Sequence, residues 1–474
     1  MPKHLPYSRA LNDYAVGSVL RLHLPGHGGG RWVAPESEGL LPPALWPADT
    51  VQVLDLDDIH YPFGPLGRAQ ELTSRLYGAD RCWFLVNGST VGILAMALAA
   101  LAPEDCVIIP RSAHRSIHNA VLLSGAYPLY APTPYDDFME TAHCVEAGAV
   151  QRLLSEHGGI KACLFESLNG YGAAADVKGV VGVLRENGVL ALADEAWGAH
   201  LIASPELPAS ACEAGADLAV QSAHKTLNAL GQGAWLLQYG SRVEPARVAE
   251  ALRSLQTSSP SSLITASLDL ARYNLEKRGR EEWERTVRLA RQARERIAEE
   301  TIFSCPLPQG AVAYDPTRVA ISGRGTGCDG QLLECRLRYR HNIQVDMSDL
   351  HQTLISLTPA HTEADLDRLI VALREVGEVG RGQSADIELP SFPAWEAAEM
   401  APRQAWQASR EWVAWEKAAG RVSAGRIVTY PPGISLVCPG ERFTAEQVEY
   451  LRRSVELGLP VEGINEEGLV ACVG

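Results

Sequence analysis

The chain contains very little lysine. Of its 42 basic residues only six are lysine, at positions 3, 161, 178, 225, 277 and 417, so arginine carries nearly all of the positive charge. The net charge of −15 argues against nucleic acid or an anionic membrane as a general partner, because both bind through a positive field. A lysine inside a glycine- and alanine-rich stretch, such as Lys225 in SAHKTLNALGQG, therefore suggests a position that needs an amine.

Several other features are absent. The ten cysteines form no CxxC pair and no spacing with histidine that is typical of zinc sites, so we expect reduced, buried thiols in a cytoplasmic protein. The N-terminal stretch MPKHLPYSRALNDYAVG lacks the apolar segment of a signal peptide. The longest apolar run, residues 91–102, is too short to span a bilayer. A length of 474 residues with 46% apolar residues predicts a globular protein of two or three domains.

Short β-rich runs alternate with helical stretches between residues 80 and 240. The runs are RCWFLV, CVIIP, YPLYA, KACLFES, GVLALAD, ADLAVQS and GAWLLQY, and helices are expected over 91–101 and 177–187. This alternation predicts an α/β domain with a mostly parallel sheet, covered by helices on both faces. Ligands of such sheets bind at the carboxyl ends of the strands.

The rest of the chain predicts further domains. An arginine- and glutamate-rich pattern over residues 263–300 predicts a solvated helix that links domains. Strands expected near 311–314, 318–322, 343–346 and 353–357 indicate a smaller α/β domain. The C-terminal part predicts a Trp-rich helix, the turn-rich stretch YPPGISLVCPGE and a short helix. The expected parts are an arm (1–30), a large domain (31–270), a small α/β domain (271–380), a linker (381–393) and a C-terminal α+β domain (394–474).

Two residues at predicted strand ends suggest an aldehyde cofactor. Lys225 could condense with an aldehyde or a carbonyl group, although an exposed lysine would show the same pattern. Asp194 ends the apolar run GVLALAD about 30 residues earlier. A carboxylate there could keep the ring nitrogen of pyridoxal phosphate protonated, or it could simply be a helix N-cap.

Two further motifs fit the same cofactor. In FLVNGSTVG a strand ends before Gly88, Ser89 and Thr90, where a helix begins. The backbone amides and hydroxyls there could bind a phosphate, or the hydroxyls could only cap the helix. In IIPRSAHRSIH the ring of His114 could stack on a flat cofactor, although a lone loop histidine is commonly structural. The order 88–90, 114, 194 and 225 is hard to explain as independent coincidences.

These motifs resemble those of the bacterial ornithine/lysine/arginine decarboxylases, which are fold-type-I pyridoxal-phosphate enzymes, and the length is similar to the family's short members. The resemblance covers nearly the whole chain. Its motifs are LPGHGGG, LDDIHYPFGPLGRAQ, FLVNGSTVG, PRSAHRS, GAYPLY, DEAWGAH, SAHKTLNALGQ, LQTSSPSSLITASLD and YPPGISLVCPGE. It implies an aspartate-aminotransferase-like fold with residues 31–270 as the cofactor-binding domain.

The resemblance also implies roles for individual residues. Lys225 would form a Schiff base with pyridoxal phosphate, Asp194 would pair with the pyridine nitrogen, and His114 would stack on the ring. The phosphate would be held or flanked by residues of the same strand ends: Gly88, Ser89, Thr90, Ser222 and His224. Ala196 and Trp197 would line the cofactor. Thr257 or Ser258 would reach the phosphate of a neighbouring subunit, which implies at least a homodimer and leaves a higher homo-oligomer open.

The chain departs from the family's motifs at several positions. Gly28 replaces the lysine of PGHK, Ser112 stands in RSAH where RNxH is usual, and Trp197 replaces a histidine. Leu168 and Asn169 replace a Pro-Thr pair next to the cofactor. We hypothesise that Asn169 donates a hydrogen bond to the cofactor's ring hydroxyl. None of these departures removes a residue needed to bind the cofactor, but several fall where the substrate is expected, so they leave the identity of the substrate open.

The implied reaction is decarboxylation of a basic amino acid. Arginine is the first expectation, followed by lysine or ornithine, and a place in polyamine metabolism would follow. Asp57, Asp58 and Glu441 are among the acids that could face a cationic side chain. Two alternatives stay open: an aminotransferase or lyase acting on a modified amino acid, and a non-catalytic cofactor-binding regulatory or partner subunit. We expect no metal, nucleic-acid or membrane partner.

Overall fold

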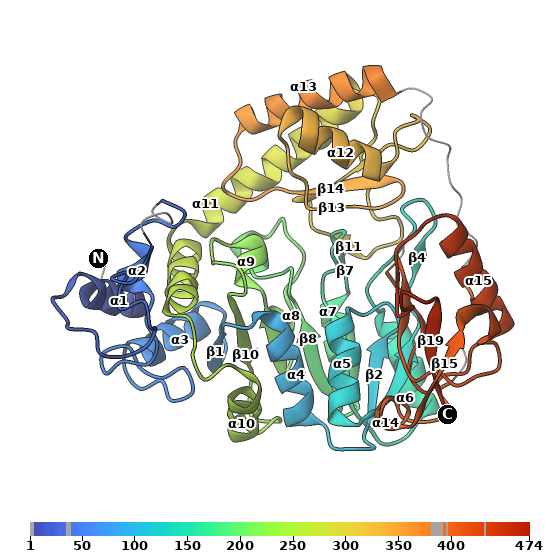
Figure 1. Ribbon diagram of the computed structural model, residues 1–474, viewed down its shortest axis with the longest axis horizontal. Helices are drawn as coiled ribbons and strands as arrows, with labels where there is room; N and C mark the ends of the chain where they lie inside the picture. Colours follow the sequence, from blue (N-terminus) through green and yellow to red (C-terminus); the bar gives the residue numbers. More distant parts are fainter. Residues whose placement is uncertain (1–3, 35–38, 381–391, 395–396, 431–432) are drawn as a thin grey trace. The chain divides into compact units, whose positions relative to one another are not determined.

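The computed structural model describes residues 4–34, 39–380, 392–394, 397–430 and 433–474 (Figure 1). Contacts divide the chain into two compact units. The first unit comprises Met1–Ala100, Leu190–Pro205 and Ala209–Glu281, and the second comprises Leu101–Val189, Glu206–Pro208 and Glu282–Gly474. Most of the predicted linker 381–393, together with residues 1–3 of the predicted arm, lies outside the described residues.

Four strands form the sheet of the first unit: β1 (Arg81–Leu85), β10 (Ala234–Gln238), β9 (Leu218–Gln221) and β8 (Leu190–Asp194), in that spatial order. β8 and β9 are parallel, whereas β10 is antiparallel to both β9 and β1. β1, β8 and β9 therefore run in the same direction, and their carboxyl ends share one edge. Every residue of β8, β9 and β10 is buried, which explains the continuous apolar runs in the sequence.

The helices of the first unit are α1 (Pro6–Val16), α2 (Leu45–Ala48), α3 (Pro65–Leu76), α4 (Gly88–Ala100), α8 (Ala211–Ala214), α9 (Ala223–Thr226) and α10 (Pro245–Leu255), with a short 3₁₀ turn at Leu201–Ala203. α11 (Ser262–Glu300) belongs to both units. It buries Leu268, Trp283 and Ile297, so it is less solvated than its charge pattern predicts. No helix in the described ranges has both the length and the apolar character that a membrane crossing needs.

The second unit begins with three parallel strands, β6 (Ile160–Glu166), β2 (Cys106–Pro110) and β3 (Tyr127–Ala131), in that order. Three helices connect and follow these strands: α5 (Arg115–Ser124), α6 (Ala147–Glu156) and α7 (Val177–Glu186). Two small ladders complete this part, β4 (Tyr135–Asp136) with β5 (Thr141–Ala142), and β7 (Ala173–Ala174) with β11 (Ala313–Tyr314). All seven strands predicted between residues 80 and 240 are present, and the α/β class is confirmed.

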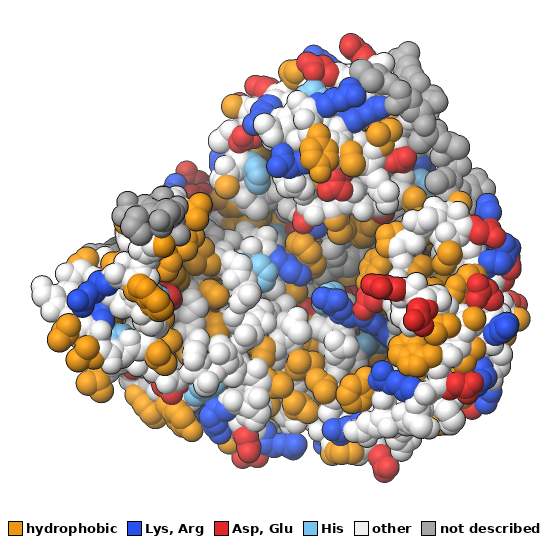
Figure 2. Space-filling model, viewed as in Figure 1, with side chains coloured by type: hydrophobic (Ala, Val, Ile, Leu, Met, Phe, Trp, Pro, Cys, Tyr) orange, Lys and Arg blue, Asp and Glu red, His pale blue; other side chains and the backbone are white. Residues whose placement is uncertain are grey.

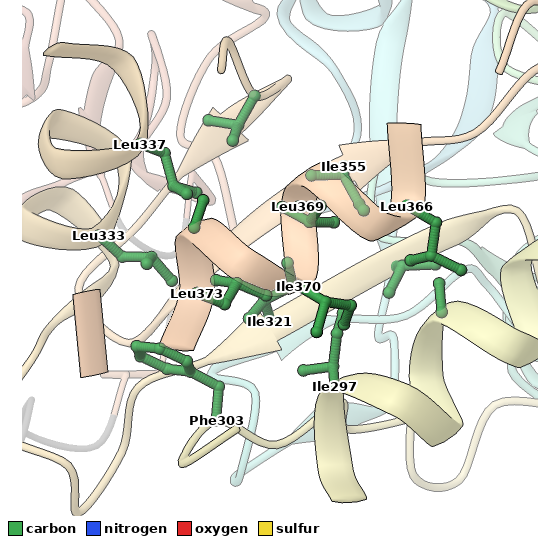
Figure 3. Close-up of a cluster of buried hydrophobic side chains, with 14 of the residues drawn as sticks. Ile297, Phe303, Ile321, Leu333, Leu337, Ile355, Leu366, Leu369, Ile370 and Leu373 are labelled. Atoms are coloured by element: carbon green, nitrogen blue, oxygen red, sulfur yellow. The ribbon is translucent and has the colours of Figure 1, made fainter. Parts of the chain in front are cut away.

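A small α/β domain follows within the second unit. Its antiparallel sheet has the order β12 (Arg318–Ser322), β14 (Gln352–Ser356) and β13 (Met347–Ser348). The sheet packs on the end of α11, α12 (Gly330–His341) and α13 (Glu363–Gly380) through a buried apolar cluster that includes Ile297, Phe303, Ile321, Leu337 and Leu373 (Figure 3).

The strand predicted near 343–346 lies later in the chain, at β13, and the amide of Asp346 already donates to Leu354 O of β14 at 3.0 Å. Asn342 ends α12 in a left-handed conformation, with φ of 55°. The amide of Ile343 then bonds back to Leu337 O at 2.9 Å, so this backbone closes a helix instead of entering a sheet.

The C-terminal domain contains two small antiparallel sheets. One pairs β15 (Arg410–Ala414) with β19 (Leu469–Val473), and the other has the order β17 (Ser435–Val437), β16 (Ile427–Thr429) and β18 (Val461–Glu462). The helices are α14 (Pro402–Gln407) and α15 (Ala445–Glu456), with a 3₁₀ turn at Trp415–Lys417. The predicted Trp-rich helix is wrong, because only Trp406 lies in the short α14. Trp412 pairs with Ala471 across β15 and β19, and this strand partner overrides local helix preference.

The C-terminal domain packs against β3 and α5 of the same unit. The hydroxyl of Tyr127 donates to Ala398 O at 2.5 Å. The Nδ1 atom of His118 lies 3.8 Å from the sulfur of Cys438. The centroid of the His118 ring lies 6.1 Å from that of the Tyr130 ring. His118 is buried near the charged Arg111 and Arg426, so its surroundings disfavour the protonated ring.

Acid should destabilise this packing through His118. Burial, together with the charges of Arg426 and Arg111, lowers the pKa of His118 from 6.5 to about 3. Between these values the unfolded chain binds a proton that the folded chain does not, so the free energy of unfolding falls as the pH falls from 6.5, by about 1.4 kcal/mol per pH unit. Urea unfolding at pH 7 and pH 5 measures this effect. Between these values the free energy of unfolding of the wild type should fall by about 2 kcal/mol more than that of a His118→Phe variant. Equal pH slopes for the two proteins would contradict this prediction.

Candidate active site

The predicted lysine, aspartate and serine positions meet at one edge of the first unit's sheet. Asp194 is the last residue of β8, Lys225 lies four residues after β9, and Ser89 lies four residues after β1. Because these three strands run in the same direction, their carboxyl ends bring the side chains together. The strand pattern alone therefore explains why residues more than 130 positions apart belong to one site.

Lys225 lies in α9, a single turn that follows β9 directly. Its backbone amide donates to Ser222 O at 3.1 Å, which fixes the turn. Its Nζ lies 4.1 Å from the centre of the Trp197 ring, a distance at which the ring face attracts an ammonium group. Trp197 is the residue that departs from the family's histidine, and the structure places it directly against the amine.

Asp194 is a buried carboxylate beside this amine. Only 4% of the residue is exposed, and its Oδ1 accepts a hydrogen bond from the amide of Ala196 at 3.0 Å. Burial raises the pKa of Asp194, while the nearby charge of Lys225 opposes the rise. No α-helix starts after Asp194, because residues 195–200 form turns. The helix N-cap interpretation is therefore wrong, and a cation at this carboxylate would stabilise its charged form.

Serine hydroxyls and helix amides lie at the start of α4. Ser222 Oγ donates to Ser89 Oγ at 2.8 Å, and both residues are buried. Gly88 has φ of 76° and donates its amide to Gln232 O at 2.9 Å, so it makes the turn from β1 into the helix. Thr90 is exposed in the first turn. A 13-residue helix with hydroxyls at its first turn is a favourable place for a phosphate.

His224 and the segment after α10 flank this region. His224 Nδ1 bonds Gly233 O at 2.9 Å, and since a carbonyl can only accept, Nδ1 carries the proton. Burial lowers the pKa of His224, which favours the neutral ring. The amide of Thr257 donates to Asn87 Oδ1 at 3.2 Å, and Ser258 is exposed.

Glu195, which sequence reasoning missed, holds the carboxyl ends of β8 and β9 together. It is fully buried and accepts hydrogen bonds from Ser210 Oγ at 2.8 Å, from Ala211 N at 2.7 Å and from Gln221 Nε2 at 2.6 Å. Gln221 ends β9, so Glu195 ties the residue after Asp194 to the strand that leads to Lys225. The sequence signal that could have identified Glu195 is a second charged residue directly after the apolar run that ends at Asp194.

His114 lies in the second unit, at the start of α5. It is exposed and caps the helix, because its Nδ1 accepts from the amide of Ser116 at 3.3 Å and lies 2.7 Å from Ser116 Oγ. Its own amide donates to Glu166 Oε1 at 3.0 Å. The neighbouring Ser112, one of the departures, bonds Thr133 Oγ1 at 3.2 Å.

Asn169, also in the second unit, stabilises its own turn. Its Oδ1 accepts from the amides of Tyr171 at 3.0 Å and Ala173 at 2.9 Å, and its Nδ2 donates to Ala142 O at 2.9 Å. A turn role therefore accounts for asparagine at this position. The amide nitrogen carries a second N–H, and its bond to the cofactor's ring hydroxyl stays a prediction.

Two substitutions separate these roles of Asn169. Asn169→Ala leaves two backbone amides without their acceptor and should lower the free energy of unfolding by about 1–3 kcal/mol. Asn169→Asp keeps the acceptor for the two amides but replaces the NH2 group, which also bonds Ala142 O, by a charged oxygen, so it should shift the cofactor's absorption band if the amide donates to the ring hydroxyl. An Asn169→Asp protein with an unchanged band at every pH would contradict the donor role.

The acids suggested for substrate recognition have hydrogen-bond or ion-pair partners within the chain. Asp57, with φ of 65°, accepts amide hydrogen bonds from Gly64 at 2.8 Å and Leu66 at 2.9 Å at the start of α3. Glu441 is 1% exposed and is paired with Arg111, 330 positions away in sequence. Both carboxylates thus have structural partners. Asp58 is half-buried and accepts from the amide of His60 at 2.8 Å.

The first unit's residues fit pyridoxal phosphate. The buried carboxylate of Asp194 would gain from a protonated ring nitrogen, Lys225 offers an amine within the same edge, and the start of α4 offers a phosphate site. The chain thus presents a suitable group for the ring nitrogen, the aldehyde and the phosphate of the cofactor.

Comparison with known proteins agrees with this fit. Residues 5–311 match the family model of the Orn/Lys/Arg decarboxylase major domain, and residues 389–467 match that of its C-terminal domain. An arginine decarboxylase of Bacillus subtilis is 35% identical over 98% of this chain and 96% of its own length. One from Bacillus anthracis is 32% identical over 97% and 94%.

A solved structure gives the fold. The lysine decarboxylase LdcF of Francisella novicida aligns with a TM-score of 0.84 at 18% identity, over 99% of this chain and 81% of its own. The expected fold-type-I, aspartate-aminotransferase-like architecture is therefore confirmed. With both family models matched over most of its length, the chain belongs to the ornithine/lysine/arginine decarboxylase family.

Proposed function

We propose that the protein decarboxylates arginine with pyridoxal phosphate, releasing carbon dioxide and leaving the corresponding amine. The observation that carries the cofactor assignment is Lys225 Nζ, 4.1 Å from the Trp197 ring at the sheet edge that holds the buried Asp194. The choice of arginine is supported by the two Bacillus relatives, whose names describe them as arginine decarboxylases.

Pyridoxal phosphate would supply an electron sink for the charge left at the α-carbon when the carboxylate leaves. Lys225 would hold its aldehyde carbon, Asp194 its ring nitrogen, and Ser89 and Ser222 its phosphate. We propose that His114, in the second unit, lies against the ring, and that Ala196, Trp197 and His224 complete the surroundings. Thr257 or Ser258 would contact the cofactor phosphate of a second subunit.

The chain's own groups would carry the proton. Decarboxylation consumes one proton at the α-carbon for each carbon dioxide released. Lys225 Nζ is a suitable donor, because the Trp197 ring stabilises its protonated form, and the imidazole of His114 is the alternative donor. His224, with its proton on Nδ1 and its pKa lowered by burial, would have to gain a second proton to donate from Nε2 to a phosphate.

The first experiment is mass spectrometry of reaction products. Purified protein is incubated with pyridoxal phosphate and, separately, arginine, lysine, ornithine and a panel of other amino acids. We expect arginine to be converted to its decarboxylated amine. A keto acid would point to an aminotransferase, and no product from any amino acid would contradict catalysis of this kind.

We also propose that the working form is a homodimer at minimum, located in the cytoplasm and serving polyamine metabolism. All ten cysteines are free, as suits a reducing compartment. On the face in Figure 2, hydrophobic side chains gather over the N-terminal segment. Its exposed members include Leu22, Trp32, Leu54 and Phe63, with Trp32 at 84% and Phe63 at 90% exposure. Monomers seldom leave so many large apolar side chains in water, so sedimentation at the mass of one chain would contradict a dimer.

A further inference from the structure

Arg111 connects the loop that carries His114 to the C-terminal domain. It directly follows β2 and is 1% exposed. Its Nε donates to Ser435 O at 2.9 Å, and its Nη2 donates to Leu436 O at 3.1 Å. Both acceptors lie on β17, so the guanidinium that follows β2 is inserted into the edge of this strand of the C-terminal domain.

The carboxylate of Glu441 completes this arrangement. Its Oε1 accepts from Arg111 Nη1, and its Oε2 accepts from Nη2 at 2.8 Å. The amide of Cys438 also donates to Oε2, at 2.7 Å. The Tyr130 ring covers the guanidinium at 4.7 Å. A two-pronged pair of this kind fixes orientation as well as position.

The same loop is short and is held at its other end. The amide of Ala113 donates to Pro110 O at 3.2 Å, and the amide of His114 donates to Glu166 Oε1 at 3.0 Å. Only Ser112 and Ala113 separate Arg111 from His114. The direction in which the loop leaves β2, and hence the place of the His114 ring, depends on where Arg111 is anchored.

We propose that Glu441 is a positioning residue that acts through Arg111 to fix His114 for the reaction, which gives the C-terminal domain a role in catalysis. This proposal rests on the proposed function, in which His114 contacts the cofactor. Stability alone explains the buried pair poorly, because apolar residues of similar volume commonly stabilise a core as well or better. The directional bonds of the pair supply what an apolar contact would lack, a single orientation for the loop.

The test compares Glu441→Gln with a matched control. Glutamine keeps the shape but leaves the buried Arg111 without its counter-charge, so the loop should loosen. We expect hydrogen exchange of the amides of residues 112–116 to rise about tenfold or more, and kcat/KM to fall about a hundredfold, as when a reactive group moves by about 1 Å. Glu399→Gln breaks the exposed pair of Glu399 with Arg442 in the same domain and should change neither quantity.

A double-variant cycle separates positioning from general damage. If Glu441 acts through His114, adding Glu441→Gln to His114→Ala should cause no further fall in kcat/KM, and the affinity for pyridoxal phosphate should follow the same pattern. Additive losses, or unchanged exchange in residues 112–116, would overturn the proposal. If Glu441→Gln does not fold, Glu441→Asp takes its place, with a smaller loss of the same kind expected and additive losses again decisive.

Failure of the proposed function would look different. Hydrogen exchange and cofactor affinity report on the loop whatever the substrate is. A wild-type protein that binds the cofactor but leaves arginine unchanged would overturn the proposed function. Faster exchange in residues 112–116, together with a loss of cofactor affinity that vanishes in the His114→Ala background, would still support positioning by Glu441.

Discussion

Replacement of Lys225 by alanine is expected to abolish steady decarboxylation while the fold is retained. The substitution removes the amine that would hold the cofactor's aldehyde and a potential proton donor, so kcat should fall by about 10⁴-fold or more. The loss in stability should be modest, because the attraction to the Trp197 ring is worth about 0.5–2 kcal/mol, and the buried Asp194, which also loses the nearby charge of Lys225, can take up a proton. Product mass spectrometry and thermal unfolding check the two parts.

Lys178→Ala is the matched control, since Lys178 is an exposed lysine of α7 and should tolerate the change in both assays. Borohydride reduction of the wild-type protein loaded with cofactor should attach the cofactor to the peptide that contains Lys225. A label on another lysine, or substantial turnover in Lys225→Ala, would remove the basis of the cofactor assignment.

Replacement of Asp194 by asparagine is expected to have opposite effects on catalysis and on stability. Without a carboxylate the ring nitrogen of the cofactor would lose its counter-charge, and kcat should fall by about 10²–10³-fold, the size typical of losing one well-placed electrostatic contact. The cofactor-free protein should be at least as stable as the wild type near neutral pH. Burial raises the pKa of Asp194, which means that the charged carboxylate is less stable in the folded chain than in the unfolded chain.

Asp217→Asn is the control that separates an effect on the cofactor site from a general effect on the stability of the sheet. Asp217 is also buried, but it precedes β9 and accepts from the amide of Ala191 at 2.8 Å and from Arg242 at 3.0 Å. It therefore lies at the amino end of the strands, where substitution should lower stability and leave cofactor affinity intact. Equal effects of the two substitutions on cofactor affinity would argue against pairing of Asp194 with the cofactor.

The sequence was informative where its pattern repeats locally. Buried strands need continuous apolar runs, so the seven longer strands between residues 80 and 240 could be identified, whereas the two-residue strands β4, β5 and β7 could not. The candidate residues follow those strands directly, and the direction of parallel strands places their ends on one edge. Lys225, Asp194 and Ser89 could thus be assigned to one site before any contact was known.

Local patterns misled where an interaction outside the pattern, whether distant or close in sequence, decided the structure. Trp412 has neighbours that suit a helix, but it pairs with β19 near the end of the chain. Ile343 has strand preference, but its amide closes α12. Asn169 was interpreted only through the cofactor, whereas its side chain also holds the turn around Tyr171 and Ala173.

The amino-acid sequence by itself was enough to recognise the family through the resemblance of its motifs, to predict the α/β class and to single out Lys225 as the candidate amine, because each depends on residue types within short segments. Only the tertiary structure decided that Trp197 covers the amine, that Glu195 braces the strand ends and that Glu441 is occupied by Arg111. Such pairings join residues far apart in sequence, and burial makes them strong, because a charge removed from water is retained only beside a compensating partner.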